Sequence, residues 1–401
     1  MPVLYPILIA LLNCVSPIVN GTERKWKMPA TIEEFRITRY EWPRSRPIGD
    51  SQVRADWHHT GSVELTSTSG QVGLGFFGAL FHPLPPLAEL TRAFAEEVFP
   101  GLTGQNAFTL GHRVSRPRGG NIGKGGSLFG LAVDQALWDL QAKELGLPLY
   151  RLLGGTNNRV PAYASGLDYH LTTDDAAAFF AEAKRQGFEA FKVKVGNPDL
   201  QWDLDRLRAI DAAVGPGARL MVDANEAWSS KEAIRRSHAY RDAGFNIYWV
   251  EDPILRDDFV GLAEVRRAVP FAHINSGEYL DLRGKRLLME ARGVDVLNIH
   301  GGISAGMRAG WLAAEYGIPI SLGNTPFELG VHLAAALPEV LYLEYSFQDY
   351  NRMVVEPVQF AGGYAFAPDR PGHGLTLSDY ARHELAKPEP VSHEQYSSGL
   401  F

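Results

Sequence analysis

The sequence predicts an α/β protein in which strand–helix units repeat through the larger, C-terminal part of the chain. Asp223, Glu251 and Glu278 each stand near the end of a short apolar run, at intervals of 28 and 27 residues. Such an interval accommodates one strand, one helix and two loops. Continued along the chain, it predicts strand starts near residues 160, 190, 219, 247, 272, 294, 318 and 341. Eight parallel strands with crossover helices predict a closed (β/α)8, TIM-type barrel, preceded by an N-terminal α+β capping domain.

This pattern also predicts the domain boundaries. We expect residues 28–158 to form the capping domain and residues 159–360 the barrel. Residues 361–401 begin rich in glycine and proline, and we expect them to return to the cap and end in a tail. Residues 1–27 are expected to be an N-terminal extension or a mis-assigned start. Their apolar run at 3–12 is too short to cross a bilayer and lacks a preceding positive charge, so we expect a cytoplasmic protein, with export through a signal segment as the alternative.

The composition excludes several classes of function. Of the 401 residues, 45% are hydrophobic and 21% are charged, which is ordinary for a soluble globular protein. The net charge is −7 and the basic residues are scattered, so we expect no binding to nucleic acid or to a membrane surface. The single cysteine, Cys14, excludes an internal disulfide and a cysteine-based metal site. We expect a small-molecule substrate and a homo-oligomeric assembly.

The capping domain is expected to begin with two strands, Glu33–Trp42 and Ser62–Phe77, the second broken into a hairpin at Ser69 and Gly70. Between these strands we expect a polar loop, Pro43–Gly61.

Helices are expected after the strands. The first is Leu87–Val98, and the second is Ser127–Leu145, with Ser127 as its N-cap and Gly146 as its stop. The segment Arg116–Gly126 contains two glycine pairs but lacks the spacing of a phosphate-binding loop, so we expect a flexible loop. The expected barrel helices include Thr173–Gln186, Gln201–Val214 and Lys231–Ala243.

The predicted strand Phe191–Val195 adds two lysines to the acidic residues. Lys192 and Lys194 have the same parity and therefore point the same way. Because the C-terminal ends of barrel strands meet at one mouth, the lysines and the three carboxylates should converge there. Carboxylates that meet without a counter-ion repel each other, whereas a hard divalent cation accepts oxygen ligands alone. The pattern predicts one Mg²⁺ per chain, with Mn²⁺ as an alternative ion, held by Asp223, Glu251 and Glu278; for any single carboxylate, a salt bridge or a helix cap is the other interpretation.

The chain resembles the enolase superfamily, within its mandelate racemase and muconate lactonising group, in the motifs Lys-Val-Lys-Val-Gly, Val-Asp-Ala-Asn-Glu-Ala-Trp, Val-Glu-Asp-Pro and Ser-Gly-Glu. The resemblance extends from about Glu33 to about Leu377. It implies that Mg²⁺ holds a substrate carboxylate and stabilises the enediolate formed when a base removes the α-proton. It also implies that the loop Pro43–Gly61 folds over the barrel mouth and selects the substrate, which makes Arg54 and His58 candidate substrate contacts; a solvated surface loop is the other interpretation of these residues.

The sixth and seventh strands depart from the family pattern. Members similar to mandelate racemase carry an Asp after the sixth strand and a His after the seventh, and muconate lactonisers carry a Lys on the sixth. This chain has His300 at the sixth-strand position and no histidine in segment 320–328. A satisfied core or surface residue is the other interpretation of a lone histidine at a strand end. Glu328 matches a family glutamate that lies against the substrate carboxylate; in that role it must be protonated, which its apolar neighbours favour. Asn225 is either a contact to a substrate oxygen or a cap of the following helix, and His332 is expected to be structural.

Together these features predict a Mg²⁺-dependent lyase that dehydrates an acid sugar to a 2-keto-3-deoxy acid. The metal and Glu328 would hold the carboxylate, and Lys194 or His300 would take the α-proton. Lys194 suits the base because Lys192 beside it would depress its pKa, and His300 suits the acid because its ordinary pKa of about 6.5 lets it carry a proton near neutrality. A racemase or epimerase, or a cycloisomerase, would use the same enediolate. A metal-binding barrel without turnover is the alternative from a different class.

Overall fold

The computed structural model describes residues 30–78, 82–114 and 128–391. The expected N-terminal extension, the loop Arg116–Gly126 and the expected N-cap Ser127 lie outside these ranges. Within them, no helix is both long enough and apolar enough to cross a membrane.

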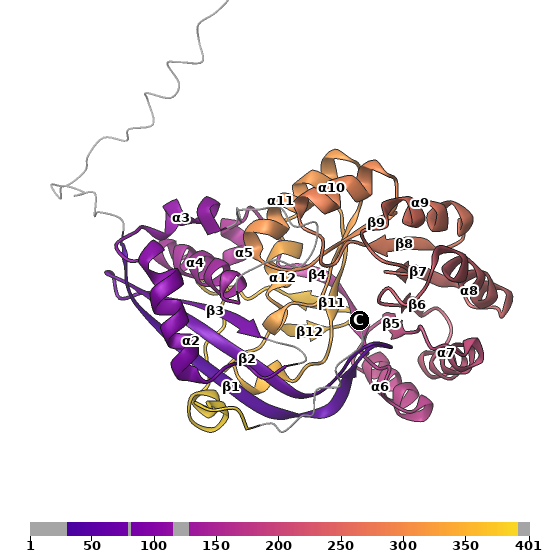
Figure 1. Cartoon of the computed structure of the whole chain (residues 1–401), viewed down its shortest axis with the longest axis horizontal. Coiled ribbons are helices and arrows are strands. Elements are labelled where there is room, and N and C mark those ends of the chain that lie inside the picture. The colour runs from indigo at the N-terminus through magenta and orange to yellow at the C-terminus, as the bar shows by residue number, and fades with distance from the viewer. Residues whose placement is uncertain (1–29, 79–81, 115–127, 392–401) are drawn as a thin grey trace, which may run out of the picture.

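The larger body is a closed barrel of eight parallel strands surrounded by helices (Figure 1). Its first and last strands, β4 (Arg159–Ser165) and β11 (Val340–Tyr345), pair in parallel and close the barrel. The other strands are β5 (Ala190–Lys194), β6 (Arg219–Asp223), β7 (Ile247–Glu251), β8 (His273–Ser276), β9 (Val296–Ile299) and β10 (Ile320–Leu322). Each begins within two residues of its predicted start, which confirms the predicted fold class.

Capping side chains define where most of the barrel helices begin. Five of them have an N-cap side chain, Thr172, Asp199, Ser229, Asp258 or Asp281, that accepts a hydrogen bond from the first turn. Because a cap defines where a helix starts, it also holds the loop between strand and helix to a set length. The helices are α6 (Thr173–Arg185), α7 (Leu200–Val214), α8 (Ser230–Asp242), α9 (Phe259–Ala268), α10 (Leu282–Glu290), α11 (Ile303–Glu315) and α12 (Gly330–Ala334).

The cap contains a three-stranded antiparallel sheet and a group of helices packed on it. The sheet runs in the order β1 (Ile32–Gly49), β2 (Arg54–Ser67), β3 (Val72–Gly78). The helical segments are α2 (Leu87–Ala93), η1 (Phe94–Val98), η2 (Phe99–Gly101), α3 (Ala107–Val114), α4 (Gly130–Leu145) and α5 (Leu149–Leu152). The expected hairpin at Ser69 and Gly70 is present, and Gly146 ends α4 with φ 68°, as predicted.

Helix α4 packs directly on β3, because its side chains accept hydrogen bonds from the strand and a glycine of the strand leaves room for the helix backbone. The side chains of Gln135 and Asp139 accept hydrogen bonds from the backbone N–H groups of Phe76 and Leu74, each at 2.8 Å. A Cβ at Gly73 would stand only 2.1 Å from the carbonyl oxygen of Ala136. One apolar core therefore fills the space between the cap sheet and its helices, and a second, larger one includes the residues between the barrel strands and their helices.

The prediction of a polar loop at Pro43–Gly61 is wrong. Strand β1 continues to Gly49 and β2 begins at Arg54, so the segment is mostly a long hairpin. The prolines at 43 and 47 suggested a loop, but β1 is an edge strand, where a residue without an N–H costs little. The pairing of β1 with β2 shifts register between Pro43 and Ile48, which accommodates both prolines.

The tip of this hairpin reaches the barrel, as Figure 1 shows for the indigo strands that extend towards α6. The N–H of Gly49 donates to the carbonyl of Leu167 at 3.0 Å, just beyond β4. The side chain of Gln52 donates to the backbone carbonyl of Asn225, just beyond β6. The cap thus contacts the barrel at the C-terminal ends of its strands.

The chain after the barrel joins barrel and cap a second time. A hairpin of β12 (Gln359–Ala361) and β13 (Tyr364–Phe366) adds to the sheet beside β4. The following residues, 367–391, form a segment that we call the C-terminal strap. Its His373 accepts a hydrogen bond at its carbonyl from His332 and donates its N–H to Asp139 of α4 at 2.8 Å, which supports the structural role predicted for His332. Arg382 forms an ion pair with Glu64 of β2 at 2.9 Å.

Arg39 of β1 links the cap to the C-terminal strap. Its side chain is fully buried. The guanidinium donates to the carbonyls of Leu84, Lys387 and Glu389 at 3.2, 3.3 and 3.1 Å, and it pairs with Glu41. A buried arginine is tolerated only when its donors find partners, and here two of the carbonyls come from the strap.

Candidate active site

The strand register brings the predicted lysine and carboxylates side by side at the barrel mouth. Lys194 of β5 is opposite Asp223 of β6, and Asp223 is opposite Glu251 of β7. Glu278 follows β8 by two residues. All four side chains are buried or nearly so. The predicted convergence at the C-terminal ends of the strands therefore occurs.

The two lysine ammonium groups lie among the carboxylates. Lys192 Nζ is 2.6 Å from Glu251 Oε1 and 3.2 Å from both Asp223 Oδ2 and Glu344 Oε1. Lys194 Nζ donates to Asp223 Oδ2 at 2.6 Å and to Asn225 Oδ1 at 2.5 Å. Buried ions are tolerated only when paired and hydrogen-bonded in this way.

Neutral side chains orient the central carboxylate. Asn275 of β8 donates to Glu251 Oε2 at 3.0 Å, and Asn298 of β9 donates to Glu251 Oε1 at 3.1 Å. Ser321 of β10 in turn donates to Asn275 at 3.3 Å. These contacts orient the Glu251 carboxylate from β8 and β9, whereas Lys192 reaches it from β5.

The charges of the two lysines differ from expectation. Burial would lower the Lys194 pKa, and Lys192 lowers it further, but the Asp223 and Asp50 carboxylates outweigh both and raise it. The Lys192 pKa is raised as well, because Glu251 and Glu344 outweigh its burial. The prediction that Lys192 makes Lys194 neutral near pH 7 is therefore wrong for the site without substrate. Sequence spacing placed the positive charge of Lys192 beside Lys194, but it did not show that carboxylates contact Lys194.

The pKa values of the three predicted metal ligands shift in different directions. Burial, reinforced by Asp223 and Glu344, raises the Glu251 pKa although Lys192 opposes the shift. Burial raises the Glu278 pKa to about 7, with Arg256 opposing at 4.0 Å. Asp223 behaves differently, because Lys194 and Lys192 outweigh burial and lower its pKa.

A hard divalent cation fits this donor set in its chemistry. Asp223, Glu251 and Glu278 offer only oxygen atoms, from three adjacent strand ends, and two of the three have raised pKa values that a nearby cation would lower. In the described part of the chain, no three His, Cys, Asp or Glu side chains already stand close enough to coordinate one ion.

Two adjoining cavities open at the mouth. The first, which we call the lysine cavity, has a volume of about 510 Å³ and is lined by Lys194, Asn225 and Glu278. The second, which we call the histidine cavity, has a volume of about 270 Å³ and is lined by His58, His59 and His300. Gly78, Tyr279 and Asn324 line both cavities, so one ligand could occupy the two together.

His300 stands at the end of β9, four strands around the barrel from β5 and Lys194. Its ring meets the ring of Tyr279 edge-on, with 5.2 Å between the ring centres. Burial lowers the His300 pKa to about 4, and Glu344 only partly offsets this shift. The expectation that His300 carries a proton near neutrality is wrong for the site without substrate: its imidazole is neutral at pH 7.

The predicted substrate contacts from the cap have different surroundings. His58 of β2 lines the histidine cavity and stacks on Trp42, with 4.2 Å between the ring centres. Arg54, in contrast, is exposed, does not appear among the lining residues of either cavity, and makes two 2.9 Å hydrogen bonds to Asp56. Asn225 lines the lysine cavity, where its side chain accepts a hydrogen bond from Lys194. The N-cap of the following helix is Ser229, so the capping interpretation of Asn225 is wrong.

Glu328 lies outside the described linings of both cavities. It belongs to a tight turn, η3 (Pro326–Glu328), in which Phe327 and Glu328 both have positive φ, 58° and 55°. Phe327 and Leu329 are buried beside it. Burial raises the Glu328 pKa from 4.5 to about 8, so the carboxyl is protonated at pH 7, as expected for a hydrogen-bond donor. Its contact with a substrate carboxylate remains a prediction.

The Glu328 pKa predicts a dependence of stability on pH. In the unfolded chain the carboxyl ionises above pH 4.5, but in the folded protein only above about pH 8. Below pH 4.5 this carboxyl does not destabilise the folded protein, and the free energy of unfolding falls as the pH rises from 4.5 to 8. Gln at this position cannot ionise. The free energy of unfolding of Glu328→Gln should therefore rise relative to that of wild type as the pH increases from 5 to 8, by on the order of 3 kcal/mol.

Thermal unfolding with Mg²⁺ present, followed at pH 5, 6, 7 and 8, measures this effect. The matched control is Glu315→Gln, at an exposed position on α11. We expect the Tm difference between variant and wild type to grow with pH for Glu328→Gln and to stay constant for Glu315→Gln. A constant difference for both variants would show that Glu328 is already ionised in the folded protein.

Several site residues were not singled out from the sequence. Glu344 is in contact with Lys192, Arg256 pairs with Asp252 at 2.8 Å, and Arg44 lines the histidine cavity. Glu344 could have been found by the rule that identified the other carboxylates, because it lies near the end of the last barrel strand. Arg44 could not, because the segment around it was assigned to a loop.

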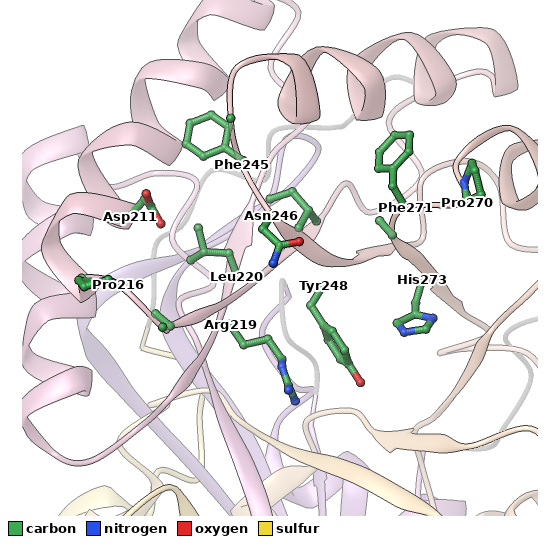
Figure 2. A pocket seen from close by; sticks show the side chains of 16 residues that line it. Asp211, Pro216, Arg219, Leu220, Phe245, Asn246, Tyr248, Pro270, Phe271 and His273 are labelled. Atoms are coloured by element: carbon green, nitrogen blue, oxygen red, sulfur yellow. The ribbon is translucent and has the colours of Figure 1, made fainter.

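A further hollow, of about 590 Å³, lies at the opposite end of the barrel (Figure 2). It is formed around the first residues of β6, β7 and β8, including Arg219, Tyr248 and His273. The Arg219 guanidinium stacks over the Tyr248 ring at 4.4 Å and hydrogen-bonds the Tyr342 hydroxyl. Barrel enzymes place their chemistry at the C-terminal ends of the strands, so this hollow is not the candidate active site.

The sequence matches two family profiles. Residues 34–154 match the mandelate racemase/muconate lactonising enzyme N-terminal domain, and residues 175–381 match the enolase C-terminal domain-like family. The chain belongs to the mandelate racemase/muconate lactonising enzyme family. This confirms the resemblance and identifies the protein as an enzyme of the enolase superfamily.

Relatives in this family carry out several reactions. The 3,6-anhydro-α-L-galactonate cycloisomerase of Streptomyces coelicolor is 36% identical, covering 88% of this chain and 98% of its own. A solved structure from Mesorhizobium loti, named provisionally as a mandelate racemase, is 54% identical with a TM-score of 0.86, covering 90% of this chain and 96% of its own. The L-talarate dehydratase of Polaromonas, solved with Mg and L-glucarate, is 28% identical with a TM-score of 0.77, covering 89% and 98%.

Proposed function

We propose that this enzyme is a Mg²⁺-dependent lyase that dehydrates an acid sugar to a 2-keto-3-deoxy acid. The observation that carries the proposal is the position of two proton-transfer groups, Lys194 and His300, on opposite strands of the barrel beside a cluster of carboxylates. Dehydration needs one group to remove the α-proton and one to protonate the departing hydroxyl. The dehydratase from Polaromonas, with its bound Mg and L-glucarate, supports the substrate class and the metal.

Asp223, Glu251 and Glu278 would hold the metal, whose charge stabilises the substrate carboxylate as electron density moves onto it. Asn275 and Asn298 keep the Glu251 carboxylate oriented by donating hydrogen bonds to it from β8 and β9. The substrate would lie across the lysine and histidine cavities, with one face towards Lys194 and the other towards His300.

In the proposed reaction His300 takes the α-proton. The electron pair of that C–H bond is delocalised towards the carboxylate and then forms the double bond between the α and β carbons as the β C–O bond breaks. Lys194 gives a proton to the departing hydroxyl, which leaves as water, and the enol product tautomerises to the 2-keto acid. This assignment reverses the one expected from the sequence. It is favoured because His300 is neutral at pH 7, and the negative charge of a bound substrate would raise its pKa.

Racemisation or epimerisation and cycloisomerisation share the first step, and the Streptomyces relative is a cycloisomerase. The test is therefore an assay that separates the products. The enzyme with Mg²⁺ would be incubated with six-carbon mono- and diacid sugars of every available configuration, and the products identified by NMR and mass spectrometry. We expect loss of water and a 2-keto acid. A product of unchanged mass would replace the lyase by an epimerase or cycloisomerase, and no reaction of any acid would favour a barrel without turnover.

A further inference from the structure

Lys285 is a buried lysine near the start of α10, and its side chain contacts two neighbouring barrel strands at their site ends. Only 3% of the residue is exposed. Its Nζ donates hydrogen bonds to the backbone carbonyls of Gly277 and Asn298, the second at 2.9 Å. Gly277 directly precedes Glu278, and Asn298 stands two residues before His300. One side chain thus links the segments that carry a predicted metal ligand and the proposed base.

The two carbonyls lie where the pairing of β8 with β9 stops. The parallel register ends with Ser276 opposite Leu297. Continued by one residue, it would set Gly277 opposite Asn298, but Gly277 has φ 109° and leaves the extended conformation. Lys285 therefore joins the same two residues that the strand pairing would have joined next.

Packing alone does not require a lysine at this position. Lys285 stands four residues after the N-cap of α10, and the corresponding residue of α6, α8 and α9 is fully buried and apolar: Ala176, Ala233 and Leu262. In α7 it is Asp203, whose carboxylate accepts hydrogen bonds from backbone N–H groups just beyond β5 at 3.4 and 3.3 Å. A buried lysine costs side-chain entropy and the desolvation of its amine. At this position, polar residues therefore coincide with backbone contacts at strand ends.

Lys285 does not reach the substrate cavities. It lines neither the lysine cavity nor the histidine cavity. In the part of the chain that the structure describes, no carboxylate forms an ion pair with it. Burial lowers the Lys285 pKa to about 7, although Asp252 and Glu278 oppose this shift. A neutral amine still has two N–H groups, one for each carbonyl, so the two contacts do not depend on the charge. Lys285 can act on the reaction only through the groups that it holds.

We propose that Lys285 is a positioning residue that holds the end of β8 against the end of β9, and thereby sets the place of Glu278 relative to His300. The inference rests on the proposed function, which makes Glu278 a metal ligand and His300 the base. Asn298 extends the link, because its carbonyl accepts from Lys285 while its side chain donates to Glu251 at 3.1 Å. Loss of the Lys285 contacts would therefore loosen two predicted metal ligands and the base together.

The test replaces the amine by an apolar group of similar length. For Lys285→Met, we expect the Kd for Mg²⁺, measured by calorimetric titration without substrate, to rise by about tenfold or more, as for other partners that orient metal ligands. The rate of α-hydrogen exchange in D₂O, measured at saturating Mg²⁺, should fall by about tenfold to a hundredfold, because a small displacement of His300 misaligns it with the α-proton. Lys285→Gln keeps an N–H donor on a shorter side chain and should show smaller losses in both measurements.

The matched control is Lys143→Met. Lys143 also joins a helix to the backbone of a neighbouring strand, through the carbonyl of Val72 at 2.8 Å, but it lies in the cap between α4 and β3. This variant should lower Tm and change neither the Kd for Mg²⁺ nor the exchange rate by more than about twofold. A merely structural lysine at 285 would give the same result as the control.

A lower Tm for Lys285→Met with both measurements unchanged would therefore overturn the inference, and so would a loss of only one of the two. Circular dichroism establishes that each variant is folded, and if Lys285→Met does not fold, Lys285→Gln carries the same comparison. Failure of this inference leaves wild-type dehydration intact. Absence of exchange and dehydration by wild type for every acid would instead overturn the proposed function, and this inference with it.

Discussion

Removal of any one predicted metal ligand should abolish turnover in a folded protein. For Asp223→Asn, Glu251→Gln and Glu278→Gln, we expect kcat/KM to fall by at least about a hundredfold, because the loss of metal removes several kcal/mol of transition-state stabilisation. Glu278→Gln is the most informative of the three. Its described ionic contact is with Arg256 at 4.0 Å, so a purely structural role would cost little activity.

A readout independent of activity is the effect of Mg²⁺ on thermal unfolding. A cation that binds only the folded protein raises Tm, and the three variants should lose this rise. Glu344→Gln is the control, because Glu344 lies in the same ion network, 3.2 Å from Lys192, but is not a predicted ligand. It should keep the Mg²⁺-dependent rise in Tm. Full wild-type activity in excess EDTA, or in any of the three variants, would refute the metal assignment.

The second large effect concerns the proton-transfer groups. In D₂O, wild type should exchange the substrate α-hydrogen while it forms product. His300→Asn should lose both exchange and turnover, each by about a hundredfold or more, since a positioned base contributes that much. Lys194→Met should lose turnover but keep exchange, because the α-proton is still removed on the His300 side.

A histidine at the opposite end of the barrel provides the control. His273 begins β8 and lies beside the hollow in Figure 2, so His273→Asn should change neither rate by more than about twofold. The reverse pattern, in which Lys194→Met stops exchange and His300→Asn keeps it, would restore Lys194 as the base. Wild-type turnover in His300→Asn would make His300 structural.

The positions of Lys194, Asp223, Glu251 and Glu278 could be predicted because barrel geometry converts sequence spacing into space. A strand and its crossover helix occupy a nearly constant length, and strand ends in a closed barrel share one mouth. The same rule correctly located His300 at the end of the sixth strand. Periodicity therefore sufficed to say which side chains meet.

It did not suffice to say how their charges interact. The pKa values of Lys194 and His300 depend on distances to Asp223, Asp50 and Glu344 and on burial, none of which spacing reveals. The long cap hairpin was missed for a different reason. Prolines and polar residues normally mark a loop, but on an edge strand that passes over a cavity both are compatible with a β conformation.

The burial of Arg39 has a consequence for synthesis of the chain on the ribosome. Two of the carbonyls that accept its hydrogen bonds belong to Lys387 and Glu389, which are translated about 350 residues later. A nascent chain that has completed the cap strands still holds a guanidinium without these acceptors, and burying it in that state would be costly. The cap should therefore stay open to protease and to chaperones until the strap has emerged, even after the barrel strands have begun to pair. Native packing of the cap is accordingly expected to wait for the strap rather than to be complete once the cap itself has been translated.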